Sequence, residues 1–141
     1  MEITVDRMKH SLAVARKMKD IVMQNPKEYD CSPDDAFVLG MLHDIGYEFV
    51  AEQKEHANKG GLVLKEQGYR YWREVYYHGI PQEEYTSSLL ELLNYADLTT
   101  GPSGESMTVQ QRIDDIIIRY GRESEQVIDA IKLSLINRLN C

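Results

Sequence analysis

Four ionisable side chains lie on the apolar faces of predicted helices, where a charged group needs a partner. His10 begins one such face, the pair His43-Asp44 ends a second helix, and Asp97 lies on the inner face of another. Because a carboxylate is rarely buried unless it is paired or binds a metal, both aspartates need a cation. Helical bundles build metal sites from side chains of facing helices, so these residues could converge on one metal ion.

Each of these residues also has an interpretation without a metal. Taken alone, His10 could be a hydrogen-bonded histidine at the edge of the core. Asp44 could cap a helix end beside Gly46, and Asp97 could begin the turn that follows its helix. A single His-Asp dipeptide is weak support for a metal site, so the choice depends on the order and context of the residues.

Helical periodicity covers nearly the whole chain and predicts the elements that would position these side chains. Asn25-Pro26 ends the first helix, because a residue before proline is disfavoured in the α conformation. Ser32-Pro33 supplies an N-cap and a first helical proline for the second helix. Thr108 with Gln111 resembles a capping box that begins a later helix.

We therefore expect an all-α fold, a single domain over residues 1–141 formed by a bundle of about six to seven helices. The run at 116–118 could be a short strand, but the sequence offers no second strand pattern to pair with it. The last helix is apolar enough to contribute to a homodimer, and we expect its inner face to carry Val127, Ile128, Ile131, Leu135 and Leu139. Helices are expected at about 10–25, 33–45, 55–67, 69–78, 84–98, 109–120 and 124–139.

Length, charge and cysteine content exclude several functions. The chain has 141 residues and a net charge of −7, which argues against a nucleic-acid polymer as the main partner. No apolar run approaches the roughly 18 residues that suggest a membrane span, and no secretory signal is recognisable at the start. Cys31 and Cys141 match neither a disulfide framework nor a metal-binding spacing. We therefore expect reduced thiols and a cytoplasmic location, away from membranes.

Five short segments follow one another in a recognisable order: His10-Ser11, 40–46 with His43-Asp44-Ile45-Gly46, Glu55-His56-Ala57, His78-Gly79 and Tyr95-Ala96-Asp97. This order resembles the HD-domain superfamily of metal-dependent phosphohydrolases, whose pattern is a His, a His-Asp pair and a distant Asp. The Ile-Gly after the pair is similar to an HDIG-type subset, and the two histidines before the last Asp resemble its dinuclear members. The resemblance covers a motif core at about 7–100, followed by C-terminal helices at 107–140, and implies an α-helical bundle.

The resemblance also implies a ligand set for one or two divalent transition metals. His10, His43, Asp44 and Asp97 would bind the first ion, and Mn, Fe, Co, Ni or Zn suits imidazoles with carboxylates. His56 and His78 would complete a second site, with Asp44 bridging the two ions. A single ion, with His56 and His78 contacting phosphate, is the alternative. In both versions Asp44, His56 and His78 are the candidate catalytic residues.

One position departs from the subset. Where relatives usually continue with a Lys near substrate phosphate, this chain has Tyr47. Arg7, Lys54 and Lys59 are the candidates to contact substrate phosphate in its place, although each could also be a solvated surface charge. The tyrosines and tryptophan at 69–77 could stack on a base, but at helical spacing they are more often packing residues.

The function implied by the resemblance is hydrolysis of a phosphoester or phosphoanhydride by metal-activated water. The expected substrate is a nucleotide or another small phosphorylated metabolite. A non-catalytic, nucleotide-sensing regulatory module is the alternative from a different class. A metal-dependent oxygenase is a third, because some dinuclear iron relatives oxidise their substrates.

Overall fold

The structure, a computed structural model, describes residues 3–49 and 55–136. Over these residues it contains seven α-helices, one short 3-10 helix and no strand beyond an isolated bridge between Thr100 and Ser106. The predicted all-α fold is therefore confirmed. The elements are α1 (Val5–Gln24), α2 (Pro33–Leu42), η1 (Ile45–Glu48), α3 (His56–Glu66), α4 (Trp72–Tyr77), α5 (Ser88–Leu98), α6 (Val109–Tyr120) and α7 (Glu125–Ile136).

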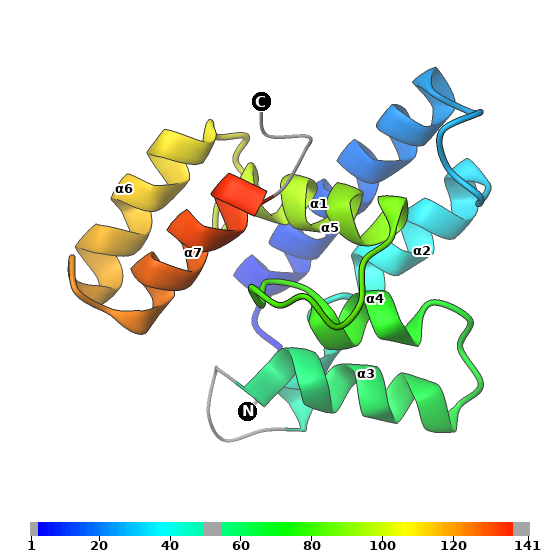
Figure 1. The fold of residues 1–141 in the computed structure, drawn as a ribbon, viewed down its shortest axis with the longest axis horizontal. Helices are drawn as coiled ribbons and strands as arrows, with labels where there is room; N and C mark the ends of the chain where they lie inside the picture. The colour runs from blue at the N-terminus through cyan, green and yellow to red at the C-terminus, as the bar shows by residue number, and fades with distance from the viewer. Residues whose placement is uncertain (1–2, 50–54, 137–141) are drawn as a thin grey trace.

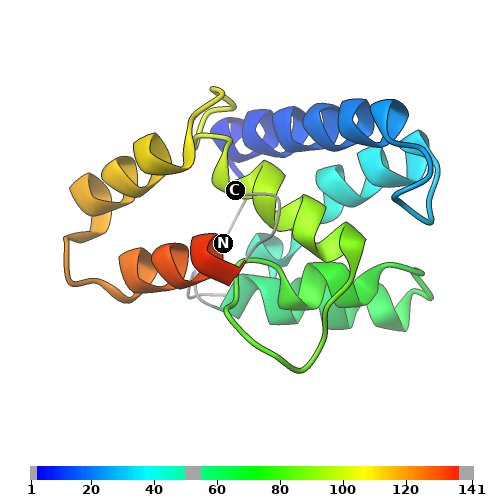
Figure 2. The ribbon, with the colours of Figure 1, turned by 45° about the horizontal axis from the view of Figure 1, so that its top comes forward.

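The helices form two groups joined by α5. In the first group α1 packs along α2, and α3 packs along α4 and η1 (Figure 1). Helix α5 contacts α1 and α4 on one side and α7 on the other. Helices α6 and α7 form a hairpin that extends away from the α1–α2 pair (Figure 2). Helix α5 therefore contacts both parts of the molecule.

Each group has its own hydrophobic core. The larger core contains the fully buried side chains of Met18, Leu39, Leu92 and Leu93, and Tyr69, Tyr71 and Trp72 pack against its edge. These contacts support the packing interpretation of the aromatic segment. The smaller core joins the end of α5 to the hairpin through Leu98, Ile116, Val127, Ala130 and Leu133.

Helices α1 and α2 approach each other at backbone distance. A Cβ on Gly40 would overlap the Cα of Ala15 and lie 2.7 Å from its backbone nitrogen. Because only glycine fits there, the middle of α1 packs directly against the last turn of α2. The imidazole rings of His10 and His43 consequently have centroids 5.3 Å apart.

The helix starts predicted from capping residues are confirmed. Ser32 and Asp35 form a reciprocal capping box at the start of α2, with Pro33 as the first helical residue. Thr108 and Gln111 form a second one at the start of α6. Helix α2 ends at Leu42, before the end predicted at 45–46, and residues 45–46 belong to η1 instead.

Helix α4 begins at Trp72, three residues later than predicted. The amide of Tyr69 donates to Leu64 O at 3.0 Å, and the amide of Gly68 donates to Lys65 O at 3.0 Å. With Gly68 at φ 77°, this is a Schellman motif that closes α3. Tyr69 therefore belongs to the cap of the preceding helix and cannot also begin the next one.

Helix α5 begins at Ser88, although the sequence pattern placed its start at Glu84. The side chain of Gln82 bonds both backbone groups of Tyr85, accepting from its amide at 2.9 Å and donating to its carbonyl at 2.7 Å. These bonds use the backbone groups that a helix would need. Ser87 then caps α5 by accepting from Leu90 N.

The buried face of α7 differs from the predicted one. Val127, Ala130 and Leu133 are buried, whereas three residues expected inside are exposed, namely Ile128, Ile131 and Leu135. Apolar residues occur on most sides of this helix, so periodicity alone could not select the face that packs. Leu139, the rest of the segment at 137–140, and Cys141 lie outside the described residues.

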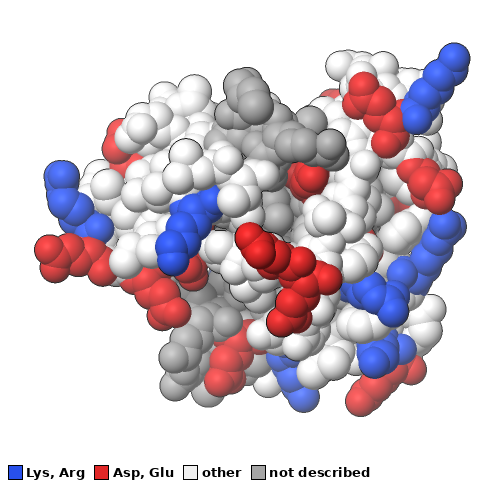
Figure 3. Space-filling view, viewed as in Figure 1, with Lys and Arg blue, Asp and Glu red and all other residues white. Residues whose placement is uncertain are grey.

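Charged side chains of both signs are interspersed over the face shown in Figure 3, with no extended area of one charge. Among the residues that the structure describes, no helix combines the length and the hydropathy that a membrane span requires.

Candidate metal centre

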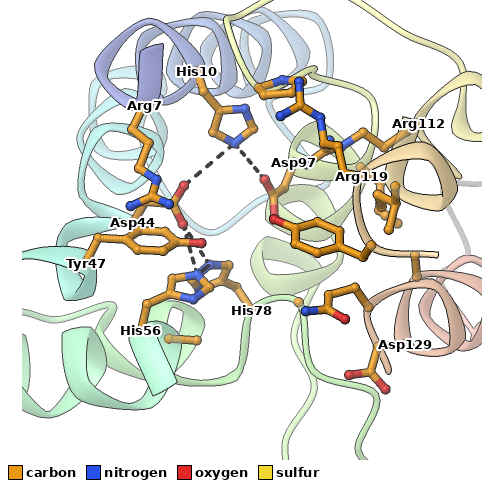
Figure 4. A pocket seen from close by; sticks show the side chains of 18 of the residues that line it. Arg7, His10, Asp44, Tyr47, His56, His78, Asp97, Arg112, Arg119 and Asp129 are labelled. Atoms are coloured by element: carbon orange, nitrogen blue, oxygen red, sulfur yellow. Dashed lines mark hydrogen bonds and ion pairs between the residues drawn. The ribbon is translucent and has the colours of Figure 1, made fainter. Parts of the chain in front are cut away.

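The structure brings all six predicted ligand residues together where the first group of helices faces the hairpin, and Figure 4 labels all of them except His43. Their nitrogen and oxygen atoms form three overlapping groups, each with its ligand atoms within 4.8 Å of one another. The residues come from separate elements: His10 from α1, His43 and Asp44 from the end of α2, His56 from the start of α3, His78 from the end of α4, and Asp97 from the last turn of α5.

Asp44 lies at the centre of this cluster. Its Oδ2 is 3.2 Å from His43 Nε2 and 3.8 Å from His10 Nε2. Its Oδ1 is 3.1 Å from His56 Nε2 and 3.3 Å from His78 Nε2. The two oxygens of one carboxylate therefore face two different pairs of imidazoles, which is the arrangement of a bridging ligand.

Asp97 completes one half of the cluster. Its Oδ1 is 2.8 Å from His10 Nε2 and 3.5 Å from His43 Nε2. In the other half, the Nε2 atoms of His56 and His78 lie 3.2 Å apart, with Asp44 between them and the first half. Oδ2 of Asp44 thus faces His10 and His43 and its Oδ1 faces His56 and His78, although His78 also lies within 4.8 Å of His43 and Asp97.

Three of the histidines are oriented by backbone carbonyls. A carbonyl oxygen only accepts hydrogen bonds, so the Nδ1 atom in each pair carries the proton and donates. The neutral ring then presents the lone pair of Nε2 to the cluster, which is the usual orientation of metal-binding histidines. The bonds run from His10 to Gly101 O (2.8 Å), from His43 to Gly40 O (2.6 Å) and from His78 to Val75 O (2.6 Å).

The nitrogen His43 Nε2 shows that a cation fits this cluster. The side chain of His43 is 0 % exposed, and its Nε2 makes no hydrogen bond with the described residues. It nevertheless lies beside the carboxylates of Asp44 and Asp97. A lone pair facing carboxylate oxygens in a buried site is unfavourable unless a positive charge lies between them. The donor set of imidazoles and carboxylates suits a divalent transition metal.

The electrostatics of the cluster also favour positive charge. Burial would raise the pKa of both carboxyl groups, but the surrounding histidines hold the pKa of Asp44 and of Asp97 well below its usual range. Burial opposes a charge on His43, yet Asp44 and Asp97 raise its pKa well above the ordinary value. Burial lowers the pKa of His78. Both carboxylates are therefore ionised at neutral pH.

We expect a divalent cation, added to protein whose metal a chelator has removed, to stabilise the fold more at pH about 8 than at pH about 6. The raised pKa of His43 means that its proton stabilises the metal-free protein at low pH, and that this contribution is lost as the pH rises through that pKa. A metal ion replaces the proton, and at about 100 times its Kd it adds about 2.7 kcal/mol. Thermal unfolding with Mn²⁺, with and without chelator, measures this, and equal shifts at both pH values would contradict it.

The loop at 99–106 supports His10. Its Gly101 carbonyl accepts from His10, while the amide of Gly101 donates to Glu105 O at 2.7 Å. Lys17 Nζ donates to the carbonyl and the hydroxyl of Thr99 at 2.8 and 2.9 Å. The loop is thus tied to α1 at two points, and it fixes the ring orientation of His10.

Tyr47 lies between a cation and an imidazole. The guanidinium of Arg7 lies 3.5 Å from the centre of the Tyr47 ring, and the ring of His56 stacks on Tyr47 at a centroid distance of 4.2 Å. Burial raises the pKa of Tyr47, and Asp44 raises it further, so the hydroxyl keeps its proton. Arg7 therefore brings a positive charge to the position where the resembling subset has a lysine.

A cleft of about 980 Å³ lies between the cluster and the α6–α7 hairpin. Of the predicted substrate-binding residues, Arg7 lines this cleft. Lys59 is exposed on α3 and is not among the lining residues, and Lys54 lies outside the described residues. The aromatic segment at 69–77 does not line the cleft either.

The far wall of the cleft was not predicted. Arg112, Arg119 and Tyr120 line it from α6, and Asp129 lines it from α7 (Figure 4). The sequence pattern assigned these helices to packing, because their apolar residues dominate the periodicity. The spacing of seven between the two arginines, on the same face as Ile116, was the signal that could have identified them.

In the comparison with known protein families, the family model of the HD domain matches residues 7–139. The match does not distinguish the HDIG-type subset, whose assignment stays a prediction. Comparisons with curated proteins and with solved structures found no match.

Proposed function

The chain belongs to the HD-domain family, and from this premise we propose that it is a metal-dependent phosphohydrolase acting on a nucleotide or another small phosphorylated metabolite. HD domains are in general metal-dependent hydrolases. The observation that carries the proposal is the buried, unbonded Nε2 of His43 between two ionised carboxylates. Either a proton on His43 or a metal ion satisfies that arrangement, and the family supplies the chemistry for which a metal ion would be used.

Six residues would hold one or two divalent ions. His10, His43, Asp44 and Asp97 would bind the first, and His56 and His78 would share Asp44 for the second. When bound, such ions polarise a phosphoryl oxygen and lower the pKa of a coordinated water. Mn, Fe, Co, Ni and Zn all suit this donor set.

The other residues of the cleft would bind and orient the substrate. Arg7 is held over the ring of Tyr47, so its guanidinium can donate to a phosphate oxygen at the edge of the cluster. The hydroxyl of Tyr47 keeps its proton at neutral pH and can act as a hydrogen-bond donor. The carbonyl of Gly101 holds the proton on His10 Nδ1 and so keeps Nε2 available as a ligand.

The volume of the cleft and the net charge of the protein support a small substrate. A volume of about 980 Å³ lies at the upper end of the range of about 300–1,000 Å³ that is usual for small-molecule sites. The net charge of −7 and the mixed charges in Figure 3 disfavour a nucleic-acid polymer as the substrate.

The test of the proposal is a substrate panel with chelated protein. Nucleotides and other phosphoesters are incubated with the protein alone and with added Mn²⁺, Co²⁺, Fe²⁺, Ni²⁺ or Zn²⁺, and released phosphate is measured. We expect turnover that depends on the metal and is lost again with chelator. A folded, metal-loaded protein that hydrolyses none of these compounds would contradict the proposal.

A nucleotide-binding measurement on the same metal-loaded protein distinguishes the regulatory alternative. Tight nucleotide binding without turnover, at full metal loading, would favour a nucleotide-sensing module. Elemental analysis of the purified protein gives the metal identity and separates one equivalent from two.

A further inference from the structure

The face of α6 that borders the cleft carries two arginines. Arg112, Ile116, Arg119 and Tyr120 all line the cleft, at the three- and four-residue spacing of one helix face. The arginines are separated by about 10 Å along the helix axis. Figure 4 shows both on the side of the pocket where Asp97 lies, across from His56 and Tyr47. The cleft thus brings the candidate metal ligands and the guanidinium groups of α6 to the same space.

These two arginines share one carboxylate. Asp115 Oδ2 accepts from Arg112 Nη1 at 3.3 Å and from Arg119 Nε at 3.0 Å. Two positive charges and one negative charge leave the trio with a net charge of +1. The side chains of Arg112 and Asp115 are only 19 % and 22 % exposed. The side chain of Arg119 is 51 % exposed, so part of the excess positive charge lies on a guanidinium that an anion in the cleft can reach.

The remaining charges of the hairpin restrict where an anion can bind. Glu125 and Asp129 line the cleft from α7 and would repel an anion there. Near α6, the exposed carboxylate of Glu105 is bound to the amide of Ser103 at 2.8 Å, which together with other backbone amides lowers its pKa more than the arginines do. Glu105 is bonded to its own loop but also interacts with both arginines, so an incoming anion at α6 competes with this carboxylate.

Resting on the proposed phosphohydrolase function, we infer that Arg112 and Arg119 form an anion subsite that binds a second anionic group of the substrate. The substrate is then a phosphorylated compound with its reacting phosphoryl group at the metal centre and a phosphate or carboxylate at its other end. Guanidinium groups suit both of these planar or multidentate acceptors. Phosphomonoesters with an uncharged leaving group are correspondingly poor substrates.

The experiment measures binding of non-hydrolysable probes to the metal-loaded protein by calorimetry. The probes are n-alkyl phosphonates, ω-carboxyalkyl phosphonates and α,ω-alkane bisphosphonates of matched and increasing chain length. We expect a two-anion probe of suitable length to bind about tenfold more tightly than its monophosphonate counterpart. If only the bisphosphonate binds more tightly than the monophosphonate, the second anionic group is a phosphate. If the carboxyalkyl phosphonate also binds more tightly, the subsite accepts carboxylates as well.

Variants of the two arginines then test whether α6 causes the higher affinity of the two-anion probes. Arg119→Gln keeps a donor for Asp115 but removes the charge, and we expect it to reduce the two-anion preference to near unity, with the monophosphonate affinity as the internal reference. Arg112→Gln is the second test, and Arg122→Gln, an exposed arginine that does not line the cleft, is the control. Circular dichroism confirms folding of each variant.

Three results would overturn the inference. If monophosphonates bind but no two-anion probe gains affinity, the subsite is absent while the proposed function stands. The same holds if both variants keep the full preference, because the arginines then only stabilise the helix through Asp115. If no phosphonate binds and no phosphoester is hydrolysed, the proposed function and the subsite both fall.

Discussion

Asp44→Asn is expected to abolish metal-dependent hydrolysis, with a fall in kcat/KM of at least about 10³-fold. Both oxygens of this carboxylate are engaged, Oδ2 with His10 and His43 and Oδ1 with His56 and His78. The amide is neutral and presents one oxygen, so it cannot serve both halves of the cluster. Metal content by elemental analysis is expected to fall together with activity, while the helical signal in circular dichroism stays.

The matched control is Asp114→Asn on α6. This aspartate is exposed, accepts one hydrogen bond from Gln110 and does not line the cleft. Its substitution removes the same charge from the chain and is expected to leave both metal content and hydrolysis at the level of the unchanged protein. An Asp44→Asn protein that retained its metal and its turnover would refute the assignment of Asp44 as a shared ligand.

The residues of the candidate centre could be selected from the sequence because they violate the helical pattern. His10, His43 and Asp97 stand on faces that are otherwise apolar, and a buried ionisable group needs a partner. Their convergence could not be derived from periodicity, which gives a face but not its neighbour. It followed from the resemblance to a family, and the structure places the six side chains in overlapping groups.

The helix ends could be predicted where a side chain supplies the cap, as at Ser32 and Thr108. The helix ends could not be predicted where a nonlocal or unusual hydrogen bond determines where the helix begins. Gln82 takes both backbone groups of Tyr85 and delays the start of α5, and no composition rule indicates such a bond. The conformation of a loop therefore depends on individual hydrogen bonds that the sequence pattern does not contain.

The role of the hairpin was missed for a related reason. On α7 the apolar residues at 128, 131 and 135 suggested a packing face, but the smaller Ala130 lies on the face that is buried. Side-chain size decides how closely two helices approach, and hydropathy alone does not report it. Once α6 and α7 are oriented by their small core, their polar faces border the cleft.

Gly46→Ala is expected to damage both the stability of the protein and its metal centre. A Cβ on Gly46 would overlap the backbone carbonyl of His56 and lie 2.8 Å from the amide nitrogen of Gly60. Backbone atoms cannot rotate away as a side chain can, so the first turn of α3 must shift, and His56 moves with it. Overpacking of this kind costs about 1–3 kcal/mol, measured as the free energy of unfolding in a denaturant titration.

A second glycine separates the loss of stability from the damage to the centre. Gly68 has φ 77°, and a Cβ added to it would meet no atom within 4 Å, so Gly68→Ala strains the backbone of the α3 cap without touching the cluster. Both variants are expected to be destabilised, but only Gly46→Ala should bind Mn²⁺ more weakly. Equal metal affinity in the two variants would contradict this explanation. If it holds, the Ile-Gly after the His-Asp pair serves a spatial purpose: it lets α3 approach closely enough for His56 to reach Asp44.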